Sequence, residues 1–194
     1  IGDDTWFDDD RYPIDFVWSD ETAGYGSQTS ALTMTPIDEY NPGTIQLSVI
    51  PNENVGEKAA IGVNPASDYI QIINKTTTIG PSEETNLKIE RLHGKNVIIV
   101  EGGVSLPLTE TVAVWEPTDQ VTHYVKNTLA SKGIKLRGKI ERGVTPNQAK
   151  LLTVHRSESL SDMLKPFMKL SINGYGEVLV KEMGRVLKGE GSWT

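Results

Sequence analysis

Hydrophobic residues alternate with polar ones through the middle of the chain and then change to helical spacing. Ile45, Leu47 and Val49 recur at every second position, which is the pattern of a strand with one buried face. Segments of similar character follow at 69–73, 87–90 and 111–115. Beyond them, apolar residues recur every three or four positions, as they do on one face of a helix. The sequence therefore predicts an α+β fold in which a β-rich middle precedes a mostly helical part.

Turn and cap residues mark where these segments should end. The stretch from 92 to 97 predicts a hairpin turn in which Gly94 adopts a positive φ. Thr118 is expected to cap a helix that stops at Gly133. The remaining predicted elements are a short helix over 28–32, a strand over 134–140, a helix over 160–168 that Pro166 bends or ends, and a helix over 175–187.

The composition excludes several classes of protein and of site. With 19 Lys and Arg against 26 Asp and Glu, the net charge is −7, which argues against nucleic acid as a partner because phosphate binding needs clustered cations. The absence of cysteine excludes disulfide scaffolds, thiol catalysis and thiolate metal sites. The purest apolar run, 97–100, has the length of a strand and not of a membrane span. Because the chain opens at Ile1 without Met or a leader, we expect an internal piece of a longer protein.

The triplet Ser171-Ile172-Asn173 falls in the turn between the last two predicted helices. A hydroxyl and a carboxamide two residues apart can converge on one substrate from such a turn. The hydroxyl can pass a proton to a leaving amine, and the carboxamide can hold a substrate amide by donating and accepting at once. Both residue types also cap helices by bonding to free backbone N–H groups, and the residues taken alone favour that interpretation.

Serine acyl-transfer sites of the penicillin-binding protein and class A β-lactamase type combine Ser-x-x-Lys, Ser-Asp-Asn and Lys-Thr-Gly elements. Only a relative of the second element is present here. No Ser is followed three positions later by Lys, and Ser161 and Lys165 are four apart. Lys75-Thr76-Thr77 lacks the glycine of the third element. The sequence therefore contains no nucleophile for such a site.

Two further groups of residues could in principle bind metal ions. The opening of the chain carries five carboxylates, but the EF-hand spacing and its bidentate Glu are absent, so a solvated, turn-forming stretch is favoured. The three histidines are too scattered for a zinc site and are predicted to lie on the surface. The carboxylates are Asp3, Asp4, Asp8, Asp9 and Asp10, and the histidines are His93, His123 and His155. We predict no metal and no other cofactor.

Trp18, Asp20 and Tyr25 form a third candidate group. Aromatic rings next to a carboxylate can bind a cationic group by cation–π attraction and ion pairing together. The plainer interpretation is that Trp18 belongs to the core and that Asp20 is a surface charge. The residues alone favour this plainer interpretation.

Four segments of the chain match one known family in the same order. They are Asp3-Asp4-Thr5-Trp6-Phe7-Asp8, the stretch 18–33, Trp115-Glu116-Pro117-Thr118, and Lys169-Leu170-Ser171-Ile172-Asn173 with Glu177. Together they resemble the class C low-molecular-mass penicillin-binding proteins, the bacterial D-alanyl-D-alanine carboxypeptidase and endopeptidase family. The last segment is the most specific, and the β-rich middle is poorly matched. Ile172 departs from the Asn that is common between Ser and Asn in that family, at a variable position.

In that family a transpeptidase-like domain is interrupted after its nucleophile by two further domains. The resemblance therefore implies that residues 1–34 and 107–148 form a split α/β second domain, into which 35–106 insert as a β-rich third domain. Residues 149–194 would be a helical piece of the β-lactamase/transpeptidase-like catalytic domain. The Ser-x-x-Lys element would precede this chain in the parent protein, and Lys-Thr-Gly would follow it.

The reaction implied for the whole protein is acylation of that upstream Ser by a peptidoglycan stem peptide, followed by release of D-Ala and hydrolysis of the ester. Ser171 would relay a proton toward the leaving amine, and Asn173 would hold the substrate amide. Asp20, with Trp18 and Tyr25, would hold the amine end of the diaminopimelate side chain. Glu21 could replace Asp20, because the resemblance does not fix the alignment to one residue. β-Lactams would acylate the same Ser, so this chain alone is predicted to be inactive.

The resemblance also implies a bacterial protein exported to the cell-wall side of the cytoplasmic membrane, where association of the parent with the membrane surface is compatible with the sequence. It leaves open whether the parent is a carboxypeptidase or an endopeptidase. Two other functions compete with it. One is a non-catalytic β-rich extracellular module that binds peptidoglycan or a protein partner, and the other is an extracellular domain that binds metal through its Asp-rich opening.

Overall fold

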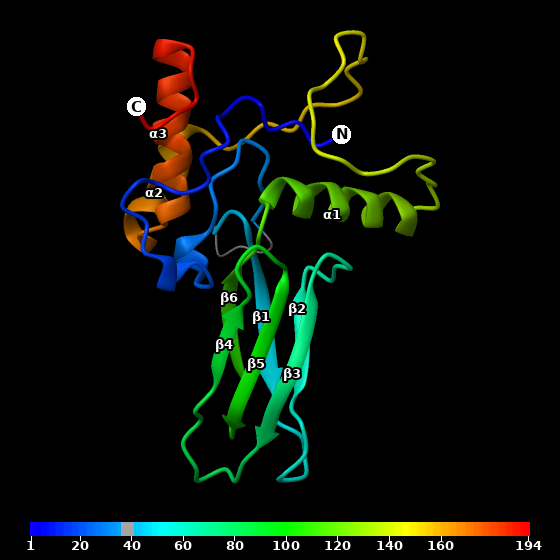
Figure 1. The fold of residues 1–194 in the computed structure, drawn as a ribbon, viewed down its shortest axis with the longest axis vertical. Coiled ribbons are helices and arrows are strands. Elements are labelled where there is room, and N and C mark those ends of the chain that lie inside the picture. Colours follow the sequence, from blue (N-terminus) through cyan, green and yellow to red (C-terminus); the bar gives the residue numbers. More distant parts are fainter. Residues whose placement is uncertain (36–40) are drawn as a thin grey trace.

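The computed structural model describes residues 1–35 and 41–194. Two three-stranded sheets face each other and form an elongated β body, with the helices gathered at one end of it (Figure 1). One sheet has the strand order β2-β1-β6, and the other has the order β3-β5-β4. The strands are β1 (Thr44–Ile50), β2 (Ala60–Asn64), β3 (Gln71–Thr78), β4 (Lys88–Arg91), β5 (Val97–Val104) and β6 (Leu108–Ala113).

The core lies between the two sheets and depends on the alternation in β1 and β5. Ile45, Leu47 and Val49 of β1 share one buried cluster with Ile98 and Val100 of β5. Each of these side chains contributes roughly 1.5–3 kcal/mol by leaving water. β1 pairs antiparallel with both of its neighbours, whereas β5 runs parallel to β3. The predicted strand with one buried face is therefore confirmed.

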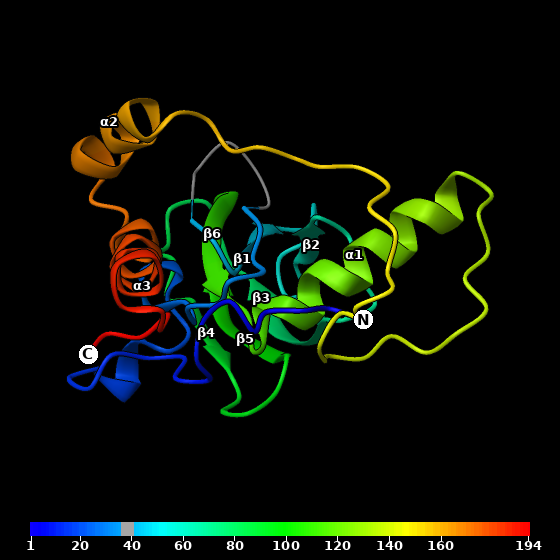
Figure 2. The same ribbon diagram turned by 90° about the horizontal axis from the view of Figure 1, so that it is seen from above.

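The three α-helices are α1 (Pro117–Ser131), α2 (Leu160–Leu170) and α3 (Asn173–Lys188). α1 lies across one end of the β body, and the N-terminal segment runs between it and the pair formed by α2 and α3 (Figures 1 and 2). Two short 3₁₀ helices precede the sheets, Trp18–Asp20 and Gly24–Gly26, and the second contacts both β6 and α3. Among the described residues, no helix has the length and apolarity needed to cross a lipid bilayer.

Two predicted turns are confirmed. Residues 92–96 join β4 to β5, which begins at Val97, and Gly94 has a φ of +69°. α1 ends at Ser131, and Gly133 lies just beyond it with a φ of +78°. Both glycines occupy the left-handed region, which a residue without a Cβ adopts at little steric cost.

Three local predictions are wrong. Residues 28–32 form no helix, and 134–140 form no strand. Just beyond residue 140, the described chain makes one isolated β-bridge, between Gly2 and Arg142. Thr118 does not cap α1, because the helix begins at Pro117, whose ring suits the first helical position, and Thr118 is buried one residue inside. Of the two outcomes expected at Pro166, the end of the helix does not occur, because α2 continues to Leu170.

The division into three domains stays a prediction. β6 pairs with β1 along its length, so residues 108–113 belong to the β body although they follow the predicted boundary at 106. Residues 36–40, at the start of the predicted β-rich domain, lie outside the described residues.

Candidate active site

The Ser-x-Asn triplet lies at the corner between α2 and α3. Ser171 follows α2 with a left-handed backbone, φ +55°, and Ile172 is buried beneath the corner. Asn173 is the first residue of α3. At Gly174 an added Cβ would come within 2.6 Å of Cγ of Pro42, so the start of α3 approaches the body of the protein as closely as a glycine allows. The corner is therefore positioned by backbone and packing rather than by its polar side chains.

The side chains of Ser171 and Asn173 are both exposed, and neither caps a helix. In the described part of the chain, the Ser171 hydroxyl has no hydrogen-bond partner. Nδ2 of Asn173 donates to the carbonyl oxygen of Tyr25 at 3.3 Å. The N-cap of α3 is Ile172, which makes no side-chain bond to the helix. The capping interpretation of the pair is therefore wrong, and their polar groups can meet a ligand.

A cavity of about 220 Å³ opens beside this corner. Asn173, Asp20 and Tyr25 all line it, so the structure brings together three of the five residues that the sequence analysis selected. Asp15 and Glu177 also line it, whereas its lining residues include no Lys or Arg. The cavity is acidic and therefore favours a positively charged group on its ligand.

Asp20 and Glu21 differ in their partners. Glu21 is only 13% exposed, and its Oε2 lies 2.9 Å from Nδ1 of His93 and 3.6 Å from Nη2 of the buried Arg91. Its charge is therefore already compensated within the protein. Asp20 lines the cavity, and its Oδ1 accepts a hydrogen bond from Oγ of Ser19 at 3.3 Å. The geometry favours Asp20 as the carboxylate that meets a ligand.

Trp18 lines a different cavity from Asp20. Its side chain is 60% exposed, so the interpretation of Trp18 as a core residue is wrong. The indole packs edge-on against Phe16 and His93, with ring centroids 5.8 Å and 5.3 Å apart. The cavity that it lines has a volume of about 340 Å³ and adjoins the cavity of Asp20 at Phe16.

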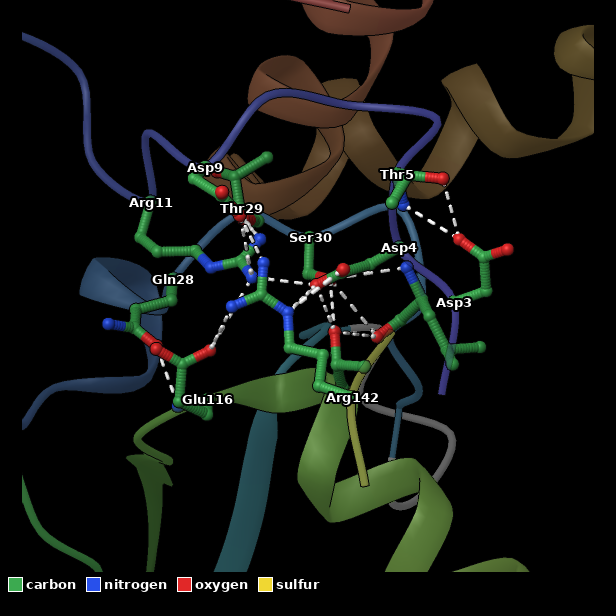
Figure 3. Close-up of polar contacts among 12 residues, drawn as sticks. Asp3, Asp4, Thr5, Asp9, Arg11, Gln28, Thr29, Ser30, Glu116 and Arg142 are labelled. Carbon is green, nitrogen blue, oxygen red and sulfur yellow. Dashed lines mark hydrogen bonds and ion pairs between the residues drawn. The ribbon is translucent and has the colours of Figure 1, made fainter. Parts of the chain in front are cut away.

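The prediction that the acidic opening is solvated is wrong at Asp4. This side chain is 3% exposed, and its Oδ2 accepts hydrogen bonds from Arg11 at 2.6 Å, Arg142 at 2.8 Å and Thr118 at 2.6 Å (Figure 3). Burial raises the pKa of Asp4, but the hydrogen bonds from Thr118, Arg142 and Arg11 outweigh burial and hold the pKa below its usual value. The network joins the N-terminal segment to α1 and to the long connection after α1.

Other carboxylates of the opening are also bound by the protein. Asp8 pairs with Lys181 of α3, and Asp3 accepts hydrogen bonds from Thr5 and from the backbone N–H of Thr145. These bonds, above all that from the Thr5 hydroxyl, hold the pKa of Asp3 far below its usual value. Within residues 1–35 and 41–194, no three His, Asp or Glu side chains are grouped as metal ligands would be.

Lys181 ties α3 to the opening of the chain. Its ammonium group is completely buried, binds Asp8 and lies 3.7 Å from the ring centroid of Trp193. The indole of Trp193 in turn donates to Oε2 of Glu177 at 2.7 Å, and Glu177 lines the acidic cavity. Asn173 therefore begins a helix that residues from both ends of the chain hold in place.

Arg11, Arg142 and Lys181 are the structurally important residues that the sequence analysis missed. They neutralise Asp4 and Asp8 from positions 7, 138 and 173 residues away. No local spacing connects the last two to their partners. The one available signal is the concentration of acidic residues at the opening, because buried carboxylates require cations from elsewhere in the chain.

Comparison with known proteins places these features in a family. The whole chain, residues 1–194, matches the family model described as "D-Ala-D-Ala carboxypeptidase 3 (S13) family". It is 35% identical over 197 residues to a D-alanyl-D-alanine carboxypeptidase of Actinomadura sp. (strain R39), covering 98% of this chain and 36% of that protein. It is 26% identical over 172 residues to the D-alanyl-D-alanine carboxypeptidase DacB of Haemophilus influenzae, covering 87% and 34%. The chain thus spans about a third of the length of these curated relatives.

Solved structures share the fold. The crystal structure of penicillin binding protein 4 (dacB) from Haemophilus influenzae matches with a TM-score of 0.75 at 22% identity, covering 99% of this chain and 44% of that one. Its complex with a novel β-lactam matches with a TM-score of 0.56 at 24% identity, covering 75% and 34%. The mixed α+β architecture and the resemblance to low-molecular-mass penicillin-binding proteins are confirmed. Since the family model matches every residue, the chain belongs to the D-Ala-D-Ala carboxypeptidase 3 (S13) family.

Proposed function

We propose that this chain is part of a serine D-alanyl-D-alanine carboxypeptidase or endopeptidase that acts on peptidoglycan stem peptides through an acyl-enzyme. The nucleophile, in a Ser-x-x-Lys element, belongs to a part of the protein outside residues 1–194. β-Lactam antibiotics react with the same Ser. The enzyme works on the cell-wall side of the cytoplasmic membrane.

The observation that carries this proposal is the meeting of Asn173, Asp20 and Tyr25 at one cavity. Asn173 comes from the Ser-x-Asn element, and Tyr25, whose carbonyl it binds, lies 148 residues earlier in the chain. The exposed Ser171 hydroxyl sits at the same corner, two residues before Asn173. A proton-relay group, an amide-binding group and a carboxylate are what a peptide with a free amine requires.

The proposed reaction consists of two acyl transfers. The Ser oxygen attacks the carbonyl carbon of the penultimate D-Ala, the C–N bond breaks, and the terminal D-Ala leaves with the proton of the Ser hydroxyl on its nitrogen. The Ser171 hydroxyl relays that proton, while the Asn173 carboxamide holds the substrate amide in place. Water then attacks the ester carbonyl, releases the shortened peptide and restores the Ser hydroxyl.

Labelled penicillin tests the location of the nucleophile. The full-length protein should be labelled covalently, whereas the folded chain 1–194 should not, because its sequence contains no Ser-x-x-Lys element. Fluorescence on a denaturing gel, with the fold checked by circular dichroism, provides the measurement. Labelling of the chain alone would contradict the proposed site. A folded full-length protein that fails to react would favour the non-catalytic binding module.

Replacement of the Asp20 carboxylate by an uncharged amide tests the role of this residue. In the full-length enzyme, Asp20→Asn should raise KM about tenfold for a stem peptide with a free side-chain amine and change kcat little, since one charge-assisted bond is lost. A peptide whose amine is acetylated should not distinguish the variant from the wild type. Glu53→Gln, an exposed change in the β body, is the matched control. An equal effect on both peptides would show that Asp20 does not bind the amine.

A further inference from the structure

The β body has no part in the reaction proposed above, yet it contacts the segment that carries two residues of the acidic cavity. Asp20 and Tyr25 both lie in residues 18–26, which we call the cavity turn. The carbonyl oxygen of Tyr25 binds Asn173, so this turn also meets the Ser-x-Asn corner. Contacts that fix the cavity turn therefore act on the carboxylate and on the described anchor of the amide-binding group.

The cavity turn is closed by its own backbone. The N–H of Ala23 donates to the carbonyl oxygen of Asp20 at 3.0 Å, and the N–H of Gly26 donates to that of Ala23 at 2.9 Å. A Cβ at Gly26 would overlap the carbonyl oxygen of Asp20, so the turn is packed there as tightly as a glycine allows. A displacement of residues 21 and 22 would therefore be passed on to Asp20, because close-packed groups transmit strain.

Arg91, the last residue of β4, holds the two residues that follow Asp20. Its backbone N–H donates to Oγ1 of Thr22 at 3.1 Å, and its Nη2 donates to the carbonyl oxygen of Glu21 at 2.8 Å. Nη2 also lies 3.6 Å from Oε2 of Glu21. The end of β6 adds one bond, from the N–H of Ala113 to the carbonyl oxygen of Thr22 at 2.9 Å. The cavity turn is therefore attached to the ends of two strands.

The guanidinium of Arg91 is completely buried, which is costly for a charged group unless its bonds are well placed. Besides its bonds to the cavity turn, it donates through Nη1 to the carbonyl oxygens of Leu92 at 3.4 Å and Lys95 at 3.3 Å, in the hairpin between β4 and β5. An apolar side chain would fill this space without the cost of a buried charge but would make none of these bonds. The planar fork of donors therefore sets how the hairpin and the cavity turn lie relative to each other.

His93 reinforces this contact from the solvent side. Its Nδ1 lies 2.9 Å from Oε2 of Glu21. Its ring packs edge-on against Trp18 and Trp115, with the ring centroids 5.3 Å apart in both pairs. Trp18 is the first residue of the cavity turn and Glu21 follows Asp20 directly, so the hairpin contacts the turn on both sides of Asp20.

We propose that Arg91 is a positioning residue, which holds Asp20 where it binds the substrate amine and so gives the β body a part in selectivity. The inference rests on the proposed function, because it concerns the same amine. Arg91 is not among the residues that line the cavity of Asp20, so it acts through the cavity turn. A carboxylate displaced by about 1 Å forms a longer and weaker bond to an ammonium group, whereas a substrate without that group is unaffected.

Steady-state kinetics of the full-length enzyme test this role with the two peptides used for Asp20, one with a free side-chain amine and one with that amine acetylated. In Arg91→Lys, which keeps the charge but loses the fork of donors, KM for the free amine should rise about fivefold. KM for the acetylated peptide and both kcat values should change little. A role confined to stability would lower the apparent kcat of both peptides equally and leave the ratio of their KM values unchanged. Lys95→Gln, an exposed change on the same hairpin, is the matched control.

A double-mutant cycle separates action through Asp20 from any other route. In Asp20→Asn the amine has already lost its carboxylate, so adding Arg91→Lys should change the KM ratio of the two peptides no further. A further change of similar size in the double variant would show that Arg91 acts elsewhere, and would overturn the inference.

Thr22→Val repeats the test without altering a buried charge, because it removes only the hydroxyl that accepts the Arg91 backbone N–H. We expect KM for the free amine to rise about threefold, with the acetylated peptide again unaffected. An unchanged KM ratio in both variants would overturn the inference, and Thr22→Val decides alone if Arg91→Lys does not fold.

Failure of this inference can be distinguished from failure of the proposed function. A full-length protein that neither reacts with penicillin nor discriminates between the two peptides would contradict the proposed function, and this inference with it. A wild type that reacts and discriminates, with variants at Arg91 and Thr22 that keep its KM ratio, would contradict the positioning role alone.

Discussion

Asn173→Ala in the full-length enzyme should lower the rate of acylation by penicillin about 100-fold, without lowering the free energy of unfolding. The carboxamide is exposed at the start of α3, and its described bond is the one to the carbonyl of Tyr25. Its loss leaves no buried group unpaired. The substrate amide, however, loses a group that donates and accepts together, and misplacement of a reacting group by about 1 Å is enough for an effect of this size.

Stopped-flow measurement of acylation and urea denaturation of the same samples separate these two quantities. Asn54→Ala, at an exposed position in the β body, is the matched control and should change neither. An unchanged acylation rate in Asn173→Ala would contradict the role assigned to this residue. A large loss of stability would show instead that the carboxamide holds the corner together.

Asp4→Asn should lower the free energy of unfolding by about 3–5 kcal/mol, the usual result of removing one partner of a buried ion pair. Arg11 is almost completely buried against Asp4, and the variant leaves its charge without its main partner. Oδ2 of Asp4 also accepts the bond from the Thr118 hydroxyl. Asp9→Asn is the matched control, because Asp9 is 85% exposed and its pair with Arg142 should contribute less than about 1 kcal/mol.

The effect of Asp4 should also appear as a dependence of stability on pH. The pKa of Asp4 is lower in the folded protein than in the unfolded chain, so its contribution is present above the unfolded value of about 3.9. It is lost as the pH falls through the lower folded value. Urea denaturation between neutral and acid pH should therefore show a loss in the wild type that Asp4→Asn lacks in part. Identical pH profiles would contradict this account.

The strands of the core could be predicted because their pattern is local. β1 alternates with period two, and this period alone decides which side chains are buried. β2 was not predicted, since Ile61 and Val63 are only partly buried on an edge strand with Gly62 between them. The opposite error occurred at 134–140, where apolar residues alternate but the described chain offers no adjacent strand. A strand needs a partner as well as a pattern.

The corner of the candidate site was predictable for a similar reason. Two helical patterns are interrupted at residues 171–172, and the break is visible in the sequence. The contacts that place this corner are not local, since Asp8 reaches Lys181 across 173 positions and Asp4 reaches Arg142 across 138. The spacing of hydrophobic residues along the chain carries no information about such distant pairs. The same limit explains why Trp18 could be selected but not assigned to its own cavity.

Lys181 bears on how a substrate could reach the acidic cavity. If α3 moved away from the N-terminal segment, the buried ammonium group of Lys181 would lose its contacts with Asp8 and with the carbonyl oxygen of Asp10. The folded state therefore favours α3 in its place against the N-terminal segment. The wall formed by α3 is thus preformed, and selectivity there arises from fit rather than from closure around the ligand. We therefore expect any hinge of the parent protein to lie away from the contact between α3 and the N-terminal segment.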